Sequence, residues 1–407
     1  MGGVGSGNVA LVSSDHDARP APLIQPPRLQ TDQERSATRL ELFFDLAYVL
    51  VIAELAAVLA HDLTWSGAAV FVGLFTVTWW SWVTTTLYAN RFDTNDVIYR
   101  LAKLGGAVAV VGMAASAGEA LSARATAFAL SYLATRVLLL GLYARAYRHV
   151  EQARPTVVIY LCGTGAGAAL WAVALAVPGH GRYLLWAAGV LVEALAPVLA
   201  TRFGGGVPLH LAHLPERFGL FVMLVLGESI ASMVAGLHEG HWQPAAVGMA
   251  AVGFVAIAAA WWNYFDLGGA AGKRWLEVDG GDQESWAADA YVYGHLPVTL
   301  GLAGFAVGVE QFIAHPADGL TTGARWTMIA GVLLFFAGTA AVIGGTSGRW
   351  RTAWPWPVAV LPAVVAVGLW SRLPPVVTMG LTGGILVITV LAGIRQQHQG
   401  QLATAET

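Results

Sequence analysis

Long apolar runs separated by short polar segments dominate the sequence. Uncharged runs such as 68–87, 156–177 and 324–343 are each about 20 residues long, the length that a helix needs to cross a hydrocarbon core. Apolar segments of this kind occur at residues 40–60, 66–88, 101–119, 125–147, 156–177, 183–200, 218–236, 244–266, 291–313, 323–343, 352–370 and 374–394. The pattern predicts an all-α integral membrane protein with about 12 transmembrane helices, with ten or eleven as the alternatives.

The composition agrees with this pattern and excludes several classes of protein. Of the 407 residues, 56% are hydrophobic and 12% are charged, whereas an ordinary soluble domain has about 25% charged residues. The net charge of −3 and the lack of a strongly basic segment exclude a nucleic-acid partner on electrostatic grounds. A single cysteine, Cys162, supports neither a disulfide framework nor a cysteine-based metal cage.

Polar segments at the two ends of the chain divide it into three parts. Residues 1–35 contain many Gly, Ser, Pro and Asp residues and no apolar core of a signal peptide, so we expect a disordered cytoplasmic tail. Residues 36–395 are expected to form one polytopic transmembrane domain, and residues 396–407 a second cytoplasmic tail.

The distribution of Lys and Arg between the loops predicts the orientation, because cytoplasmic loops carry the excess of positive charge. With the N-terminus inside, fifteen basic residues lie on the cytoplasmic side, namely Arg35, Arg39, Arg91, Arg100, Lys103, Arg145, Arg148, Arg154, Arg202, Arg217, Lys273, Arg274, Arg349, Arg351 and Arg395. Four lie outside, namely Arg124, Arg182, Arg325 and Arg372. Both termini are therefore expected in the cytoplasm, and Arg136 is the one basic residue within a span.

A weak internal repeat relates the first six spans to the last six. The pair Trp79-Trp80 closes span two and precedes a Phe-Asp dipeptide, and Trp261-Trp262 closes span eight and precedes another. An offset of six spans predicts two six-helix halves related by a pseudo-twofold axis along the membrane normal. Chance matching in so biased a composition is the alternative.

Ionisable side chains within the spans are the first candidates for function, because a charge in hydrocarbon is costly unless it is paired or hydrated. Glu41 and Asp45 are four residues apart, so they share one face of a helix. Glu228 lies near the middle of span seven. These three carboxylates are the candidates for proton transfer, and we expect them to share one water-accessible cavity.

Other polar and aromatic residues are predicted at the cytoplasmic side of the same spans. A cavity that opens to the cytoplasm would place substrate-binding side chains there, for which the candidates are Arg39, Trp80, Glu216, Arg217, Trp262, Asp266 and His295. Tryptophans at span ends are also typical interfacial anchors, and arginines there also snorkel. Glu41 and Asp45 are expected to face span seven or nine, near Glu216, Arg217 or His295.

One spacing is typical of metal ligands, but its context favours a loop. His210, His213 and Glu216 are separated by three residues each, and Leu214-Pro215 interrupts the helix that would align them. We therefore predict no metal site and no cofactor.

Several polar motifs resemble, in order, those of the bacterial low temperature requirement A family. They are Arg39-Leu40-Glu41-Leu42-Phe43-Phe44-Asp45-Leu46, Asn90-Arg91-Phe92-Asp93-Thr94, Glu216-Arg217-Phe218, Leu226-Gly227-Glu228-Ser229-Ile230, Trp261-Trp262 with Tyr264-Phe265-Asp266, and His295-Leu296-Pro297. The resemblance extends over about residues 36–395. It implies a multi-pass protein of a bacterial inner (plasma) membrane and no particular biochemical activity.

Two functions of different classes fit these features best. The first is a proton- or cation-coupled transporter of a small solute, in which Glu41, Asp45 and Glu228 take up the coupling ion. The alternative is an intramembrane enzyme, in which a carboxyl group does acid/base chemistry on a lipid or isoprenoid substrate held by tryptophans. A non-catalytic membrane component is a third reading. The span count and the predicted repeat favour transport, with membrane lipid as the surrounding partner and the oligomeric state left open.

Overall fold

The protein is an all-α bundle, as the sequence predicts. A computed structural model describes residues 23–30, 38–205, 214–268, 284–316, 321–348, 350 and 355–405. Within these residues, 11 helices are long and apolar enough to cross a membrane, and one shorter apolar helix accompanies them. The chain is therefore a polytopic membrane protein.

The first half of the chain contributes six of these helices. They are α1 (Arg39–His61), α2 (Trp65–Arg91), α3 (Val97–Ala117), α4 (Ala125–His149), α5 (Arg154–Ala174) and α6 (Gly181–Phe203), with the 3₁₀ turn η1 (Glu151–Ala153) before α5. Side chains of Thr38, Thr64 and Asp96 accept the backbone N–H of the third helical residue, which fixes where α1, α2 and α3 begin.

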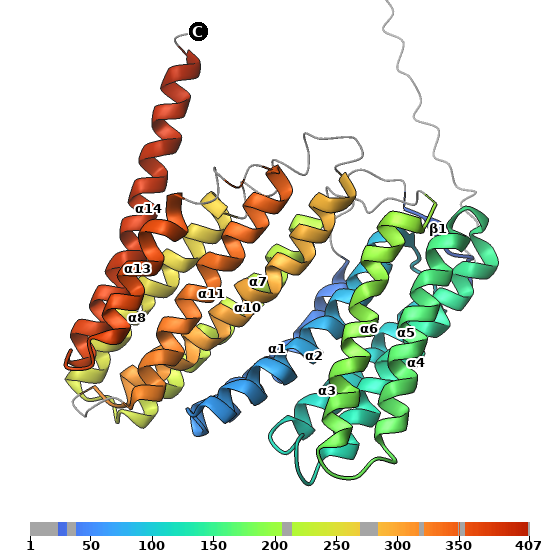
Figure 1. The fold of residues 1–407 in the computed structure, drawn as a ribbon, viewed down its shortest axis with the longest axis horizontal. Helices are drawn as coiled ribbons and strands as arrows, with labels where there is room; N and C mark the ends of the chain where they lie inside the picture. The colour runs from blue at the N-terminus through green and yellow to red at the C-terminus, as the bar shows by residue number, and fades with distance from the viewer. Residues whose placement is uncertain are drawn as a thin grey trace, which may run out of the picture.

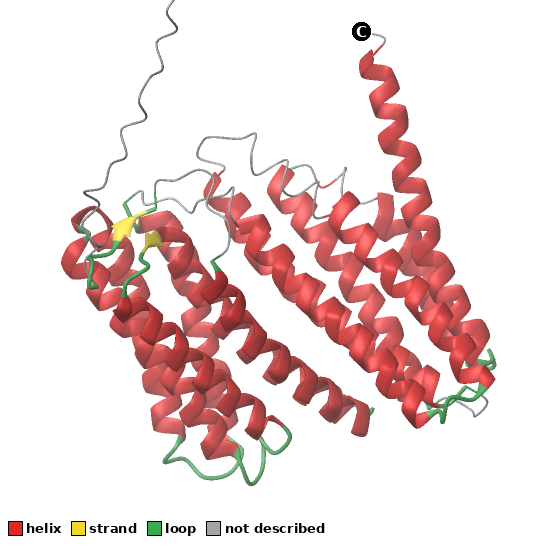
Figure 2. Ribbon diagram, turned by 180° about the vertical axis from the view of Figure 1, so that it is seen from behind, coloured by secondary structure: helices red, strands yellow, loops and turns green. Residues whose placement is uncertain are grey.

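The second half contributes the other six. They are α7 (Leu214–Glu239), α8 (Pro244–Trp262) with the π-helical turn η2 (Asn263–Gly268), α10 (Glu284–Ala314), α11 (Thr322–Ser347), α13 (Pro355–Leu369) and α14 (Pro375–Ala405). Figure 1 shows α1–α6 (blue to green) on one side of the molecule and α7–α14 (yellow to red) on the other. Figure 2 shows the same division from behind.

The two ends of the bundle are named here by the elements that they carry. The β1 face carries the two-residue strand β1 (Arg28–Leu29), its antiparallel partner β2 (Phe92–Asp93) and the end of α14 (Figure 1). The opposite face carries the α1–α2 turn at residues 62–64.

The short helix α13 still runs from the β1 face to the opposite face. It has 15 residues, or about 22 Å of helix. Arg325, at the start of α11 on the opposite face, donates from Nη1 to the carbonyl oxygen of Trp370 at 2.6 Å, just beyond the end of α13. That contact places the end of α13 on the opposite face, as expected for the eleventh of 12 crossings.

The structure describes part of each predicted tail. Residues 23–30 fall within the segment expected to be disordered, yet here β1 pairs with β2 and the backbone N–H of Gln30 donates to the carbonyl oxygen of Arg91 at 3.0 Å. Residues 396–405 continue α14 as helix, and their place in the cytoplasm stays a prediction. Residues 1–22 and 31–37 lie outside the described part of the chain.

Neighbouring helices follow the same order in each half. α1 packs on α2 and α3, and α7 packs on α8 and α10. α1, α2 and α6 contact α10 across the boundary, and α1 also contacts α7. The order of neighbours agrees with two related halves, and the pseudo-twofold axis itself stays a prediction.

The tryptophan pairs that suggested the repeat occupy different environments. Trp79 and Trp80 are each 2% exposed in the interior of α2, whereas Trp261 and Trp262 are 38% and 42% exposed at the end of α8. Trp79 and Trp80 therefore do not close a span. The tryptophan motif is no evidence for the repeat.

Candidate functional site

Asp45 is the centre of a polar contact between the two halves. Its side chain on α1 is 1% exposed. Its Oδ1 accepts hydrogen bonds from Trp82 Nε1 of α2 at 2.9 Å and from Arg217 Nη2 of α7 at 3.1 Å. The same Nη2 lies 3.0 Å from Oδ2. The expected proximity of Asp45 to Arg217 is present, and it joins α1 to α7 across the boundary.

Arg217 is buried with part of its hydrogen-bonding capacity unused. Its side chain is 7% exposed, and its Nε and Nη1 have no hydrogen-bond partner among the described residues. The next residue, Phe218, packs edge to face on Trp82 at 5.0 Å between ring centroids, and Phe221 lies 4.3 Å from the same ring. Aromatic side chains of α2 and α7 thus pack together beside the Asp45–Arg217 pair.

Glu41 has a structural role that the sequence analysis missed. Its Oε2 accepts the backbone N–H of Thr38 at 2.9 Å, and its own N–H donates to Thr38 Oγ1 at 3.2 Å. The two bonds form a capping box at the start of α1. The Thr-x-x-Glu signature before an apolar run could have revealed it. Stabilising the helix start accounts for a carboxylate at this position without proton transfer.

His295 is a fully buried polar residue of α10. Its Nδ1 lies 2.6 Å from the carbonyl oxygen of Tyr291, which can only accept, so Nδ1 carries the proton. Nε2 then accepts from the Tyr264 hydroxyl of η2 at 2.8 Å. The ring lies 4.9 Å from that of Phe218. His295 therefore links η2 to α10 beside α7.

Trp80 also reaches the boundary between the halves. Its ring stacks on Tyr293 of α10 at 5.8 Å between ring centroids. Four of the predicted substrate residues are instead exposed, namely Arg39, Glu216, Trp262 and Asp266. They lie where helices begin or end. That these four residues line the predicted cavity stays a prediction.

Glu228 does not lie with Asp45. It is eleven residues beyond Arg217 on α7, which corresponds to about 16 Å along the helix. Glu310 of α10 is an electrostatic neighbour of Glu228, whereas Glu41 is an electrostatic neighbour of Asp45. That the three carboxylates share one cavity stays a prediction.

A fully buried ion pair lies within the first half, and the sequence analysis did not predict that its two residues are partners. Arg136 of α4 donates from Nη1 to Glu193 Oε2 of α6 at 2.8 Å, and both side chains are 0% exposed. Arg136 also donates to Thr84 at 2.9 Å and to the Ser81 hydroxyl at 2.8 Å, both on α2. Each residue was recognisable as an in-span charge, but a partner 57 positions away leaves no local signal.

A second unpredicted ion pair lies at the β1 face. Arg145 donates to both carboxylate oxygens of Asp96, at 3.0 and 2.6 Å, and to the carbonyl oxygen of Gln25. Burial raises the pKa of Asp96, but the Arg145 hydrogen bond and the backbone N–H groups of Tyr99 and Gln25 outweigh it, so that its pKa lies below its ordinary value. The pair holds the segment before α1 on the end of α4.

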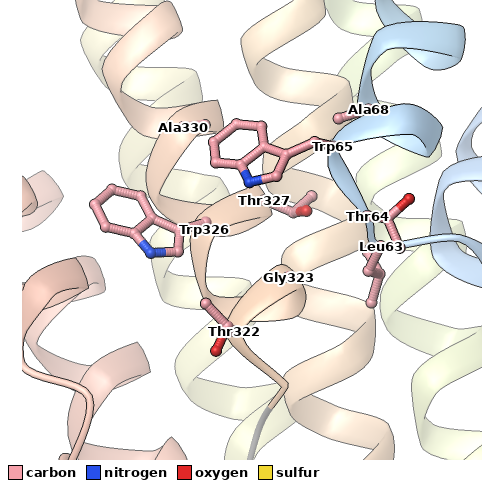
Figure 3. A pocket seen from close by; sticks show the side chains of 9 residues that line it. All are labelled: Leu63, Thr64, Trp65, Ala68, Thr322, Gly323, Trp326, Thr327 and Ala330. Carbon is pink, nitrogen blue, oxygen red and sulfur yellow. The ribbon is translucent and has the colours of Figure 1, made fainter.

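An apolar cavity of about 370 Å³ opens between the halves at the opposite face. Figure 3 shows Trp65 from the start of α2 and Trp326 from the start of α11 on its two sides. The lining residues are Leu63, Thr64, Trp65, Ala68, Thr322, Gly323, Trp326, Thr327 and Ala330. They include no carboxylate, so this cavity does not supply the acid/base chemistry of the predicted enzyme.

No metal centre is evident in the part of the chain that the structure describes, because no three His, Cys, Asp or Glu side chains there are placed to hold an ion. His210 and His213 lie outside the described residues. The interpretation of their spacing as a loop stays a prediction.

The fold and the buried polar contacts define a multi-pass α-helical membrane protein whose two halves meet at an ion pair. The chain belongs to the bacterial low temperature requirement A protein family, whose model matches residues 36–392. It is also 28% identical over 324 residues to the uncharacterized protein RA0937 of Rhizobium meliloti (strain 1021), an alignment that covers 76% of this chain and 77% of that protein.

Proposed function

We propose that this protein is a solute carrier of the bacterial plasma membrane whose two six-helix halves rock about the Asp45–Arg217 contact. The observation that supports the proposal is the buried ion pair between α1 of one half and α7 of the other. A carrier needs contacts between its halves that form in one conformation and break in another. Both side chains are ionisable, and Asp45 belongs to the first half whereas Arg217 belongs to the second.

The energetics of this pair favour a functional role over a purely structural one. Removing two charges from water costs solvation free energy. Their attraction offsets this cost only when all their hydrogen bonds are satisfied. Here Arg217 Nε and Nη1 are left without partners among the described residues. An ion pair with unsatisfied hydrogen bonds contributes little to the stability of the contact between the halves. Once the halves separate, the N–H groups of Arg217 can donate to an anionic or polar solute.

The enzyme alternative has weaker support. Its chemistry needs a carboxyl group beside a cavity wide enough for a lipid tail. Asp45 is enclosed by Trp82 and Arg217, and the described cavity at the opposite face is lined by apolar, Thr and Gly residues.

Distances between spin labels on the two halves test the proposal in the full-length protein, with Cys162 replaced by Ala. One label pair, at Phe203 of α6 and Trp286 of α10, reports on the β1 face, and another, at Trp65 of α2 and Thr322 of α11, reports on the opposite face; all four positions are exposed. We expect Asp45→Asn to lengthen the first distance and shorten the second, because breaking the pair releases the β1 face.

A matched control breaks an ion pair that lies within one half. Glu151→Gln removes the exposed partner of Arg154, whose Nη1 lies 2.8 Å from it, and should leave both distances unchanged. Unchanged distances in Asp45→Asn, or a simultaneous increase of both, would contradict alternating access. Uptake into proteoliposomes of solutes that co-purify with the protein then identifies the cargo.

A further inference from the structure

The apolar cavity at the opposite face lies in the boundary between the two halves of the molecule. The first half contributes the α1–α2 turn and the start of α2 to its lining, and the second half contributes the start of α11. The halves touch beside the cavity, because a Cβ atom added to Gly323 would collide with the carbonyl oxygen of Leu63 and lie 2.8 Å from the Leu63 Cβ. The cavity is therefore a gap between the halves that a backbone contact bounds on one side.

The position of the cavity along the helices places it at the edge of the membrane. Both α2 and α11 are long and apolar enough to cross a bilayer, and the lining follows α11 from Thr322 to Ala330, which corresponds to about 12 Å of helix. Trp65 lies on one side of the cavity (Figure 3), and its side chain is 87% exposed. Tryptophan rings at span ends typically lie at the level of the lipid headgroups. The cavity thus extends from that level into the region of the acyl chains.

The chemistry of the lining favours an uncharged occupant. None of the nine described residues that line the cavity is ionisable. The neighbouring charged residues have partners elsewhere, since Asp62 Oδ1 accepts the Thr64 hydroxyl at 2.6 Å and Arg325 Nη1 donates to the Trp370 carbonyl oxygen at 2.6 Å. A polar solute would lose hydrogen bonds to water here without gaining equivalent ones.

The size of the cavity fits a single flexible chain better than a protein partner. Its volume of about 370 Å³ lies within the range of roughly 300–1,000 Å³ that is typical of small-molecule sites. Its nine lining residues are fewer than the roughly 20–30 residues that each side of a stable protein interface contributes. The surrounding bilayer supplies flexible apolar chains directly.

We propose that an acyl chain of a membrane phospholipid occupies this cavity between Trp65 and Trp326, with its headgroup at the opposite face. A flexible chain follows the shape of the gap, so it gains van der Waals contacts with both rings that an empty cavity lacks. Binding of the chain does not depend on transport. In a carrier the chain would have to leave before the opposite face closes, a consequence that rests on the carrier function proposed above.

Photo-crosslinking of the full-length protein in liposomes tests the site. The liposomes consist of phosphatidylcholine with a minor fraction of a phosphatidylcholine that carries a diazirine group in one acyl chain, and mass spectrometry of peptides locates the label. We expect more label per residue in segments 63–68 and 322–330 than in exposed apolar segments outside the cavity, such as residues 104–111 of α3. Ala330→Phe, which adds a ring to the lining, should lower this labelling at least about fivefold.

Ala134→Phe is the matched control. Ala134 is an exposed residue nine positions after the start of α4 at Ala125, close to the depth of Ala330, which is eight positions after the start of α11 at Thr322. Ala134 does not line the cavity, so this variant should be labelled like the wild type. Label spread evenly over the exposed residues of all spans would overturn the proposal, as would unchanged labelling in Ala330→Phe.

Further variants separate the other outcomes. Should Ala330→Phe not fold, Ala68→Leu decides, because it narrows the cavity from the side of α2. A disulfide-linked dimer of Trp65→Cys, with Cys162 replaced by Ala, would also overturn the proposal, because a second copy would then cover the cavity. Labelling of the wild type does not depend on transport, so unchanged spin-label distances in Asp45→Asn would contradict the carrier and not the lipid site.

Discussion

Arg136 reaches from the middle of α4 to side chains of α2 and α6, and its hydrogen bonds join residues of the first half. The network extends to Tyr132, whose hydroxyl group donates a hydrogen bond to Glu193 Oε2 at 3.1 Å. With both ions at 0% exposure, a lone charge left in this place would have neither water nor a counterion.

We predict that Arg136→Gln lowers the free energy of unfolding by about 3–5 kcal/mol, since it leaves the Glu193 carboxylate buried and unpaired. Thermal unfolding in detergent, followed by tryptophan fluorescence, measures the effect. Arg154→Gln is the control, because its partner Glu151 is 82% exposed, and it should cost less than about 1 kcal/mol. Equal losses in the two variants would show that the buried network adds no stability of its own.

For single residues, the sequence indicates which charged side chains are costly to bury but not which residues they contact. The cost of a charge in hydrocarbon selected Asp45 and Arg136 without structural knowledge. Asp45 and Arg217 are 172 positions apart, so their contact depends on how the helices pack, which hydropathy does not report. The capping role of Glu41 was missed for the opposite reason, because its partner is local and lies three residues away at Thr38.

The elements themselves were well predicted because a bilayer leaves the backbone few alternatives to helix. The errors occur where the chain leaves the membrane. α10 begins at Glu284, seven residues before the predicted span, and α14 extends to Ala405, because polar residues in water also form helix. The strand pair of β1 and β2 was missed since each strand has only two residues.

Some glycines within the spans allow neighbouring helices to approach closely, whereas others do not. An added Cβ on Gly163 of α5 would lie 2.6 Å from the Cβ of Ala196 on α6, and one on Gly308 of α10 would lie 2.4 Å from the Cβ of Met328 on α11. Gly165 meets no atom within 4 Å. Helix periodicity explains the difference, because residues two apart face different directions.

The Asp96–Arg145 pair determines whether the segment at residues 23–30 stays on the β1 face. We predict that Asp96→Asn increases hydrogen exchange at Gln25, Arg28 and Gln30 and lowers stability by about 1.5–3 kcal/mol, the value of a hydrogen bond to a charged group. Hydrogen exchange resolved by mass spectrometry measures the first effect.

The same pair predicts a dependence on pH. Because the pKa of Asp96 in the folded protein lies below its ordinary 3.8, its contribution is present in full above that value and is lost as the pH falls through the folded-state pKa. Protection of residues 23–30 should therefore persist at neutral pH and decrease below about pH 4. Glu119→Gln is the control, since its pair with Arg124 is 53–56% exposed at the opposite face. Equal exchange in the Asp96 variant and the wild type would rule out the clamp.

For the whole molecule, the structure groups the basic residues by face in the way that the positive-inside rule requires. Arg100, Arg145, Arg148 and Arg154 lie at ends of α3, α4 and α5 on the β1 face, whereas Arg124 and Arg182 lie at the starts of α4 and α6 on the opposite face. The rule assigns the face with more Lys and Arg residues to the cytoplasm. The orientation that follows from this rule is a prediction.

We predict that the β1 face is cytoplasmic. Two uncharged, exposed positions at the two ends of α4 test this, with Cys162 replaced by Ala: Ser122 precedes the helix on the opposite face, and Gln152 follows it on the β1 face. A membrane-impermeant maleimide added to intact cells should label Ser122→Cys and spare Gln152→Cys. Permeabilised cells are the control, in which both variants should react. Labelling of Gln152→Cys alone in intact cells would show instead that the opposite face is cytoplasmic.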